Sequence, residues 1–128
     1  MNLLLDTNVL IWTLDAPQKL STEFIAEIES PENGVFVSSI SIWELIRKAQ
    51  IGKLEIPQKF EEALEKQGFR LLEFKPLHAL EVLKLQLIHR DPFDRAILAQ
   101  ASFENFTLLT SDETLRSYSD QVKIRIMG

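Results

Sequence analysis

Short apolar runs alternate with helical patterns along the chain. Five runs have the length and composition of buried strands: residues 2–5, 35–38, 69–74, 107–110 and 122–127. Amphipathic spacing or helix start signals mark five segments as helices: residues 21–30, 41–50, 58–67, 77–88 and 93–104. This alternation predicts an α/β fold with a central, mostly parallel sheet and helices on both faces. Ligands bind beyond the carboxyl ends of the strands in such sheets, so residues at that edge are candidates for function.

The 128 residues are expected to form a single domain, spanning positions 1–128. Hydrophobic residues make up 45% and charged residues 26%, which is ordinary for a soluble globular protein. The longest uncharged apolar stretch, residues 8–14, is too short to span a bilayer, and the start of the chain has no signal-peptide pattern. We therefore expect a cytoplasmic protein without membrane contact.

Two features of the composition limit the chemistry. The chain has no cysteine, which excludes disulfides, thiolate metal sites and cysteine nucleophiles. Its net charge of −5 disfavours nucleic-acid binding, because affinity for phosphates normally comes from Lys and Arg. A nucleic-acid substrate would therefore need a bound cation, a local basic rim or a protein partner to supply positive charge.

Two acidic residues follow predicted strands closely. Asp6 comes after three leucines, and Asp112 ends the motif TLLTSD. Asp6 is either the N-cap of residues 7–14 or a functional carboxylate, with Thr7 and Asn8 available to orient it or to hold a water. Asp112 is either a turn residue behind a Ser111 cap or a functional carboxylate. At both positions the residues alone leave the two alternatives open.

Acidic residues also lie near two helix starts. Glu44 follows Ser41 at the spacing of a capping box, yet it is also one turn into a helix that follows a strand. Asp91 before Pro92 has the pattern of an N-cap followed by proline at the first helical position. Asp94 lies near a helix that is apolar almost all round, where a carboxylate is costly unless it is paired or metal-bound. We favour a cap for Asp91 and a functional role for Asp94.

The parallel topology predicts that four acids from separate segments meet at one edge of the sheet: Asp6, Glu44, Asp94 and Asp112. Carboxylates brought together repel one another, and their pKa values rise unless a cation neutralises them. Mg²⁺ and Mn²⁺ prefer oxygen ligands, activate water and stabilise charge on a phosphodiester. The layout therefore predicts metal-assisted phosphodiester hydrolysis, and the cation would offset the negative net charge.

Four motifs in this order and spacing resemble the PIN-domain family: LLLDTNVLIW, SSISIWELIRK, DPFDRAILAQA and LLTSDETL. More narrowly, they look like the VapC-type toxins of bacterial type II toxin–antitoxin pairs. The resemblance runs from residue 2 to about residue 126. It implies a three-layer α/β/α fold and an endoribonuclease that uses Mg²⁺ or Mn²⁺ on structured or messenger RNA. It also implies a homodimer that a cognate antitoxin protein inhibits.

The resemblance carries functional roles over to specific residues. Asp6, Glu44 and Asp94 fall on the family's three core acids, and Asp112 falls on the more variable fourth. Asn8 falls on the polar residue that follows the first acid. The residues expected to support the four acids are Thr7, Asn8, Asp91, Thr110 and Ser111. Of these, Asp91 could ligate through a water, although capping explains it better.

Three basic residues lie near the predicted site and could bind phosphates: Lys48, Arg90 and Arg95. The simpler interpretation is surface solvation or an ion pair such as Arg95 with Asp91. His89 could also lie near the site, but metal-activated water needs no histidine base, so we expect it to make an ordinary hydrogen bond in a loop. His78 lies in a predicted helix and is expected to be structural.

Some large apolar residues invite a functional interpretation but are better explained by packing. Trp12 and Trp43 lie in apolar helical segments, which favours core or interface packing over stacking on bases. Leucines recur through the segment 77–88 at helical spacing, which predicts a core or dimer-interface face: Leu77, Leu80, Leu83, Leu85 and Leu87, with Ile88.

Two other classes of function compete with a nuclease. A phosphotransfer domain could use Asp6 as phosphate acceptor, but a haloacid-dehalogenase-like enzyme would need an acid at position 8, which is Asn8. A receiver domain would need a lysine near the acids after a late strand, and none is well placed. A PIN-like module that only binds RNA or protein is the other alternative, and the retention of four acids argues against it.

Overall fold

The computed structural model describes residues 1–56 and 58–127. In these residues the strands form one five-stranded sheet in the order β3-β2-β1-β4-β5, and each pairing is parallel. The strands are β1 (Asn2–Leu5), β2 (Gly34–Ser38), β3 (Arg70–Leu72), β4 (Thr107–Thr110) and β5 (Lys123–Ile126). The mostly parallel sheet predicted from the apolar runs is confirmed.

Helices lie on both sides of this sheet. They are α1 (Thr7–Asp15), α2 (Thr22–Glu29), α3 (Ser39–Gln50), α4 (Phe60–Lys66), α5 (Pro76–Glu81) and α6 (Pro92–Glu104). The described residues also contain three short 3₁₀ helices: η1 (Pro17–Lys19), η2 (Val82–Lys84) and η3 (Glu113–Tyr118). Pro57, after which a helix was expected to begin, lies outside the described residues. None of the described helices has the length and apolar character needed to cross a membrane.

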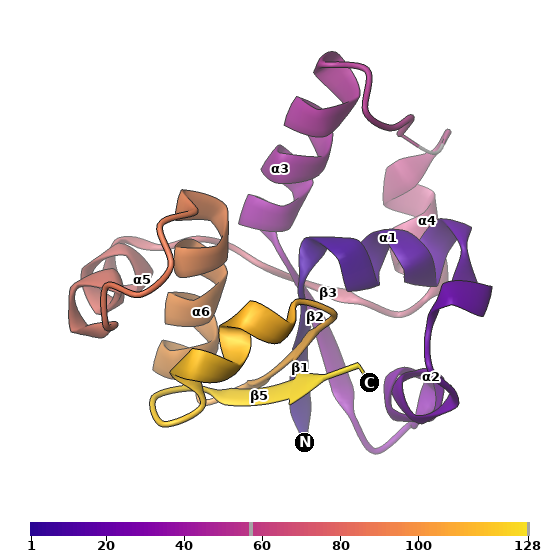
Figure 1. The fold of residues 1–128 in the computed structure, drawn as a ribbon. Helices are drawn as coiled ribbons and strands as arrows, with labels where there is room; N and C mark the ends of the chain where they lie inside the picture. The colour runs from indigo at the N-terminus through magenta and orange to yellow at the C-terminus, as the bar shows by residue number, and fades with distance from the viewer. Residues whose placement is uncertain (57, 128) are drawn as a thin grey trace.

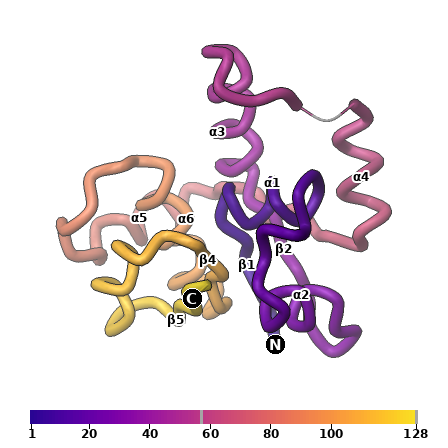
Figure 2. The backbone as a smooth tube through the Cα atoms, turned by 45° about the vertical axis from the view of Figure 1, so that its right-hand side comes forward, coloured from indigo at the N-terminus to yellow at the C-terminus, as the bar shows by residue number. Residues whose placement is uncertain are grey.

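Two apolar clusters hold the layers together, one on each face of the sheet. Successive side chains of a strand point to opposite faces, and the leucines of β1 are fully buried on both. Leu4 packs with Tyr118 in the cluster beneath α6 and η3. Leu3 and Leu5 pack with Phe24 in the cluster beneath α1 and α2. The predicted three-layer α/β/α arrangement is therefore confirmed, with α5 and α6 on one side and α1 and α2 on the other (Figures 1 and 2).

The predicted helix 77–88 is wrong beyond its first turns. Helix α5 ends at Glu81, and the chain continues through η2 into irregular structure. The guanidinium of Arg95 donates to the carbonyl of Val82 at 3.3 Å and to that of Gln86 at 3.0 Å. The hydroxyl of Tyr118 donates to the same Gln86 carbonyl at 3.0 Å. These carbonyls are bonded to groups from α6 and η3, so the segment takes its shape from tertiary contacts.

The leucines of that segment do not form a core face. Leu77, Leu80 and Leu83 are 57%, 59% and 83% exposed, whereas Leu85 is 6% exposed. The interpretation of the whole stripe as core is therefore wrong, because the segment is not one regular helix and most of its leucines face outward. An interface role remains a prediction.

Strand β3 is also shorter than the predicted 69–74. The buried side-chain amide of Gln100 on α6 donates to the carbonyls of Leu72 at 3.5 Å and Glu73 at 3.3 Å. The backbone N–H of Phe74 donates to the hydroxyl of Ser39 at 3.0 Å. The backbone after Leu72 is thus bonded to side chains of α6 and α3 and leaves the sheet.

Candidate active site

The site lies where the central strands end. Leu5 of β1 is level with Val37 of β2 and Leu109 of β4, so the residues that follow these three begin the carboxyl edge of the sheet. Asp6 follows directly, and its backbone N–H donates to the carbonyl of Leu109 at 3.0 Å. Helix α6 precedes β4 in the chain, and its first turn carries Asp94, whose charge acts on Asp6 at the same edge.

Asp6 caps a helix and belongs to the site at the same time. Its Oδ1 accepts from the backbone N–H of Val9 at 2.9 Å, which makes it the N-cap of α1. Its Oδ2 accepts from the hydroxyl of Thr110, and the backbone of Ser111 is a further hydrogen-bond partner. The residue is only 8% exposed. Burial and, to a smaller extent, the charge of Asp94 together raise the pKa of Asp6 to about 6, against the effect of these hydrogen bonds.

Glu44 has no capping role, so the predicted capping box is wrong. Helix α3 begins at Ser39, and its N-cap is Ser38, whose hydroxyl accepts from the N–H of Ile40 at 3.0 Å. Ser41 is therefore inside the helix and fully buried. The carboxylate of Glu44 instead accepts from the hydroxyl of Thr7, the residue next to Asp6, and its side chain is 12% exposed.

Helix α6 begins with a cap and carries the next acid one turn further on. Asp91 accepts from the N–H groups of Phe93 at 2.9 Å and Asp94 at 3.3 Å, with Pro92 at the first helical position, so the predicted cap is confirmed. Asp94 is half-buried, and Nε2 of His89 lies 2.7 Å from its Oδ2. Burial raises the pKa of Asp94 although His89 opposes the shift, and the charges of Asp91 and Glu44 raise it further.

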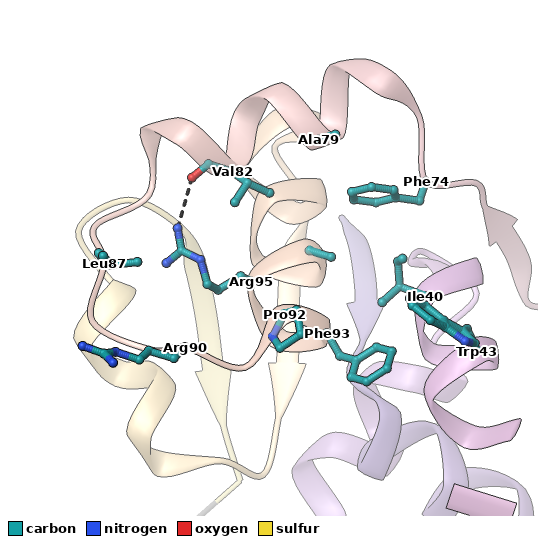
Figure 3. A pocket seen from close by; sticks show the side chains of 11 residues that line it. Ile40, Trp43, Phe74, Ala79, Val82, Leu87, Arg90, Pro92, Phe93 and Arg95 are labelled. Atoms are coloured by element: carbon teal, nitrogen blue, oxygen red, sulfur yellow. Dashed lines mark hydrogen bonds between the residues drawn. The ribbon is translucent and has the colours of Figure 1, made fainter. Parts of the chain in front are cut away.

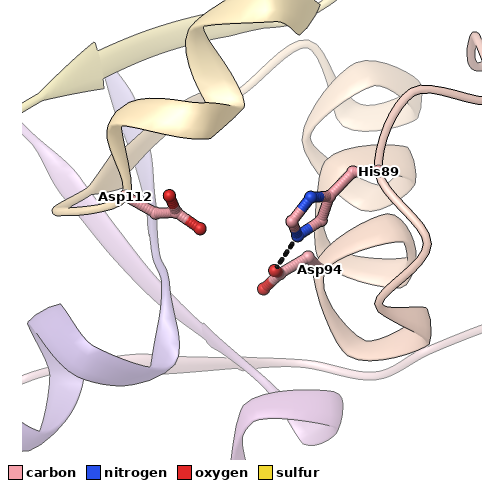
Figure 4. A group of neighbouring side chains, drawn as sticks. All are labelled: His89, Asp94 and Asp112. Atoms are coloured by element: carbon pink, nitrogen blue, oxygen red, sulfur yellow. Dashed lines mark hydrogen bonds and ion pairs between the residues drawn. The ribbon is translucent and has the colours of Figure 1, made fainter.

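Asp112 completes the group of acids. It is the N-cap of η3, where its Oδ1 accepts from the N–H and the hydroxyl of Thr114 at 3.0 and 2.6 Å. Its own N–H donates at 3.0 Å to the hydroxyl of Thr110, which is the hydroxyl that donates to Asp6. Ligand atoms of His89, Asp94 and Asp112 all lie within 4.8 Å of one another, and Figure 4 shows the three side chains converging.

The structure thus links the four predicted acids through contacts or charge, and it adds a histidine. We call these five residues the acidic site: Asp6, Glu44, His89, Asp94 and Asp112. The ordinary hydrogen bond expected for His89 is present, but its acceptor is Asp94. The signal in the sequence was a histidine placed two residues before a helix N-cap, from where it can reach the first turn.

The three basic residues differ in their surroundings. Arg95 donates to the backbone carbonyls of Val82, Gln86 and His89, the last at 3.4 Å, so its guanidinium supports the loop that carries His89. Nζ of Lys48 lies 3.6 Å from Oε2 of Glu44. Arg90 is exposed, as is Asn8.

An apolar groove lies beside the acidic site. It has a volume of about 630 Å³, and side chains of α3, the α5–η2 segment and the start of α6 line it (Figure 3). Trp43 and Phe93, the neighbours of Glu44 and Asp94, pack edge to face in its wall, with ring centroids 4.9 Å apart. Trp43 is 59% exposed, so it does not lie in the core and interface packing stays a prediction for it, whereas Trp12 is half-buried.

Comparison with known proteins agrees with this architecture. A family model described as the PIN domain matches residues 3–121. Among solved structures, VapBC2 from Rickettsia felis bound to a DNA fragment from its promoter is similar over the whole of both chains, with 18% identity and a TM-score of 0.71. VapBC-1 from nontypeable Haemophilus influenzae is similar over 98% of each chain (20%, 0.66), and FitAcB from Neisseria gonorrhoeae over 95% of each (22%, 0.61). No curated protein sequence matches the chain.

Proposed function

The chain belongs to the PIN domain family, and from this premise we propose that it is a divalent-metal-dependent endoribonuclease that acts as the toxin of a toxin–antitoxin pair. The proposed metal is Mg²⁺ or Mn²⁺, and the proposed substrate is RNA. The ligands we assign to the metal are the four acids of the acidic site: Asp6, Glu44, Asp94 and Asp112.

The observation that carries the proposal is the convergence of these acids at the carboxyl edge of the sheet, where Thr110 bonds to both Asp6 and Asp112, and Thr7, next to Asp6, bonds to Glu44. The charge of Asp94 raises the pKa of Asp6, and the charge of Glu44 raises that of Asp94. Residues that begin α1, lie in α3 and begin α6 thus repel one another at one point of the sheet edge. A divalent cation relieves such repulsion, and a set of carboxylate oxygens suits Mg²⁺ or Mn²⁺. The residues present therefore fit the ion that the family implies.

When bound, such a cation supplies water activation and stabilises the negative charge that develops on a phosphodiester. The chain's own contribution is to hold the ligands still. Thr110 and the start of α1 fix both oxygens of Asp6, and Thr7 fixes one oxygen of Glu44. Lys48 and Arg90 are the residues we propose for contact with RNA phosphates, because one pairs with an acid of the site and the other lines the adjoining groove.

We also propose two protein contacts. Structural neighbours include a member of the VapBC family of toxin–antitoxin systems from Mycobacterium tuberculosis and a toxin–antitoxin complex from Klebsiella pneumoniae, which supports an antitoxin chain as partner. A homodimer is supported by the exposed leucines at positions 77, 80 and 83, since large apolar side chains gathered on a surface are typical of interaction sites.

The proposal is tested by incubating total RNA with the purified protein in Mg²⁺, in Mn²⁺ and in EDTA. We expect discrete fragments that require metal and that disappear with Asp6→Asn. Asp120→Asn is the matched control, because it removes the same charge from an exposed turn and is expected to cleave like the wild type.

Other outcomes separate the alternatives. Equal cleavage by the wild type and Asp6→Asn would mean that the activity is a contaminant, and the nuclease proposal would fail. A protein that neither cleaves RNA nor binds metal in calorimetry would be a PIN-like binding module. An acceptor role for Asp6 in phosphotransfer would instead be supported by stable phosphorylation of Asp6 on incubation with a small phosphodonor.

A further inference from the structure

His89 is held in place by contacts at both its backbone and its side chain. Its backbone N–H donates to the hydroxyl of Tyr118 at 2.8 Å, and its carbonyl accepts from Arg95 at 3.4 Å. Its Nε2 lies 2.7 Å from Oδ2 of Asp94. Its side chain is 27% exposed, and Figure 4 shows the ring pointing toward Asp94.

The loop around His89 is built as a rigid support. Both backbone polar groups of Gln86 are hydrogen-bonded. Its N–H donates to the side chain of Gln121 at 3.0 Å, and its carbonyl accepts from Tyr118 and Arg95. Arg95 is the residue after Asp94, so the first turn of α6 both carries the Asp94 carboxylate and hydrogen-bonds to the loop that contains His89. This arrangement fixes the imidazole relative to the carboxylate, whereas a solvated loop histidine needs no such support.

The spacing of the ligand atoms suits direct coordination. Mn²⁺ and Zn²⁺ bind imidazole nitrogen and carboxylate oxygen at about 2.0–2.2 Å, so two neighbouring ligand atoms on one ion lie about 3 Å apart. In the metal-free protein the 2.7 Å between Nε2 of His89 and Oδ2 of Asp94 is a hydrogen bond, and a cation that replaces its proton would have both atoms as neighbouring ligands. Asp112 offers an oxygen within 4.8 Å of both atoms, which a small side-chain movement can bring onto the same ion.

We propose that His89 is a direct ligand of the divalent cation, together with Asp94 and Asp112, so that the metal site contains one nitrogen among its oxygens. The inference rests on the metal site of the proposed function and specifies its chemistry. Imidazole is a poor ligand for Mg²⁺, which keeps oxygen ligands and water, but a good one for transition-metal ions. The site should therefore bind Mn²⁺ more tightly than Mg²⁺, and the preference should depend on His89.

The test uses the purified protein with Mn²⁺ alone, without RNA. Pulsed electron paramagnetic resonance detects a ¹⁴N nucleus bonded directly to Mn²⁺, and calorimetry measures affinity for Mn²⁺ and Mg²⁺. His89→Gln can still donate to Asp94 but supplies no ring nitrogen, and its circular dichroism should match the wild type. We expect a ¹⁴N coupling in the wild type that His89→Gln loses. We also expect Mn²⁺ affinity to fall by about tenfold or more, with a smaller loss for Mg²⁺.

The possible failures are distinguishable with Asp6→Asn as reference. Mn²⁺ binding that Asp6→Asn abolishes, but that shows no ¹⁴N coupling in the wild type, overturns the inference and leaves the proposed function standing. A coupling that persists in His89→Gln also overturns it, because the nitrogen would then come from another residue. If Mn²⁺ does not bind the wild type, both the inference and the proposed metal site fail.

Discussion

The substitution Asp6→Asn should make the metal-free protein more stable while it abolishes activity. Asp6 is 8% exposed, and burial is the largest of the effects that raise its pKa to about 6 from a usual value of 3.8. Asparagine has nearly the same shape and no charge to bury. Its carbonyl can accept from Val9, and its amide can donate to Thr110, whose hydroxyl has two acceptor lone pairs.

The magnitude follows from the change in proton affinity. The difference between 3.8 and about 6 corresponds to about 3 kcal/mol at about 1.4 kcal/mol per tenfold change. Because the pKa of Asp6 is higher in the folded than in the unfolded state, binding a proton at Asp6 stabilises the folded protein. This contribution to the free energy of unfolding is fully present below about pH 4. It is lost as the pH rises through about 6. Asp6→Asn has no such loss, and we expect it to exceed the wild type by about 1–3 kcal/mol at pH 7.5.

The assay is urea unfolding in EDTA at pH 4 and at pH 7.5. The advantage of Asp6→Asn should be present at pH 7.5 and nearly absent at pH 4. Asp120→Asn removes the same charge from an exposed position and controls for the net charge of −5; its stability should stay within about 0.5 kcal/mol of the wild type. Mn²⁺ at about 100 times its Kd should then stabilise the wild type by about 2.7 kcal/mol and Asp6→Asn by far less.

The reasoning is refuted if Asp6→Asn is no more stable than the wild type at pH 7.5 in EDTA while the control behaves as expected. If the variant does not fold, the wild type alone decides. Its stability in EDTA must then fall between pH 4 and pH 7, and Mn²⁺ must restore it at pH 7. A wild-type stability that rises steadily over this range would mean that the Asp6 charge is not destabilising in the folded protein.

Two further substitutions test the surroundings of the site and the surface. Thr7→Val removes the hydroxyl that donates to Glu44 but keeps the volume of a side chain that is only 4% exposed. RNA cleavage should therefore fall by about 10–100-fold with little change in the unfolding midpoint, and cleavage at the wild-type rate would contradict this. Leu83→Glu places a charge at a position where the leucine is 83% exposed. Light scattering should show a smaller fraction of dimer, with an unchanged unfolding midpoint. An undiminished dimer fraction would mean that this surface is not the dimer interface.

The sheet could be predicted from the sequence because its central strands are buried on both faces. The runs at residues 2–5 and 107–110 contain consecutive leucines where a half-exposed strand would alternate with polar residues, and both are strands at those bounds. The residues at which some strands and helices end could not be predicted in the same way. The end of β3 depends on Gln100, and the end of α5 on Arg95, two residues of α6 that lie far along the chain from the carbonyls they bind. Local periodicity carries no information about such contacts.

The same limit explains the errors at the site. Three serines precede Glu44, and the sequence allows each of Ser38, Ser39 and Ser41 to begin the helix. Ser38 is the cap because β2 ends there in register with β3, and because its hydroxyl also donates to Gln100 of α6. The meeting of the acids was predictable from the parallel topology. The contact of His89 with Asp94 was not, although the histidine lies close to the α6 cap in sequence, because it depends on a loop that residues of α6 and η3 hold.

Capping and metal binding are compatible roles, and the sequence alone presents them as alternatives only because both use the same residue types. An ionised carboxylate has about four lone-pair positions, and the cap of α1 uses one of those of Asp6. At the carboxyl edge of a parallel sheet a cap is therefore an oriented ligand with lone pairs to spare. Asp91 shows the contrast, because it caps α6 with the same chemistry but is exposed. Burial beside a second carboxylate, which Asp6 has, is what makes a capping acid depend on a cation.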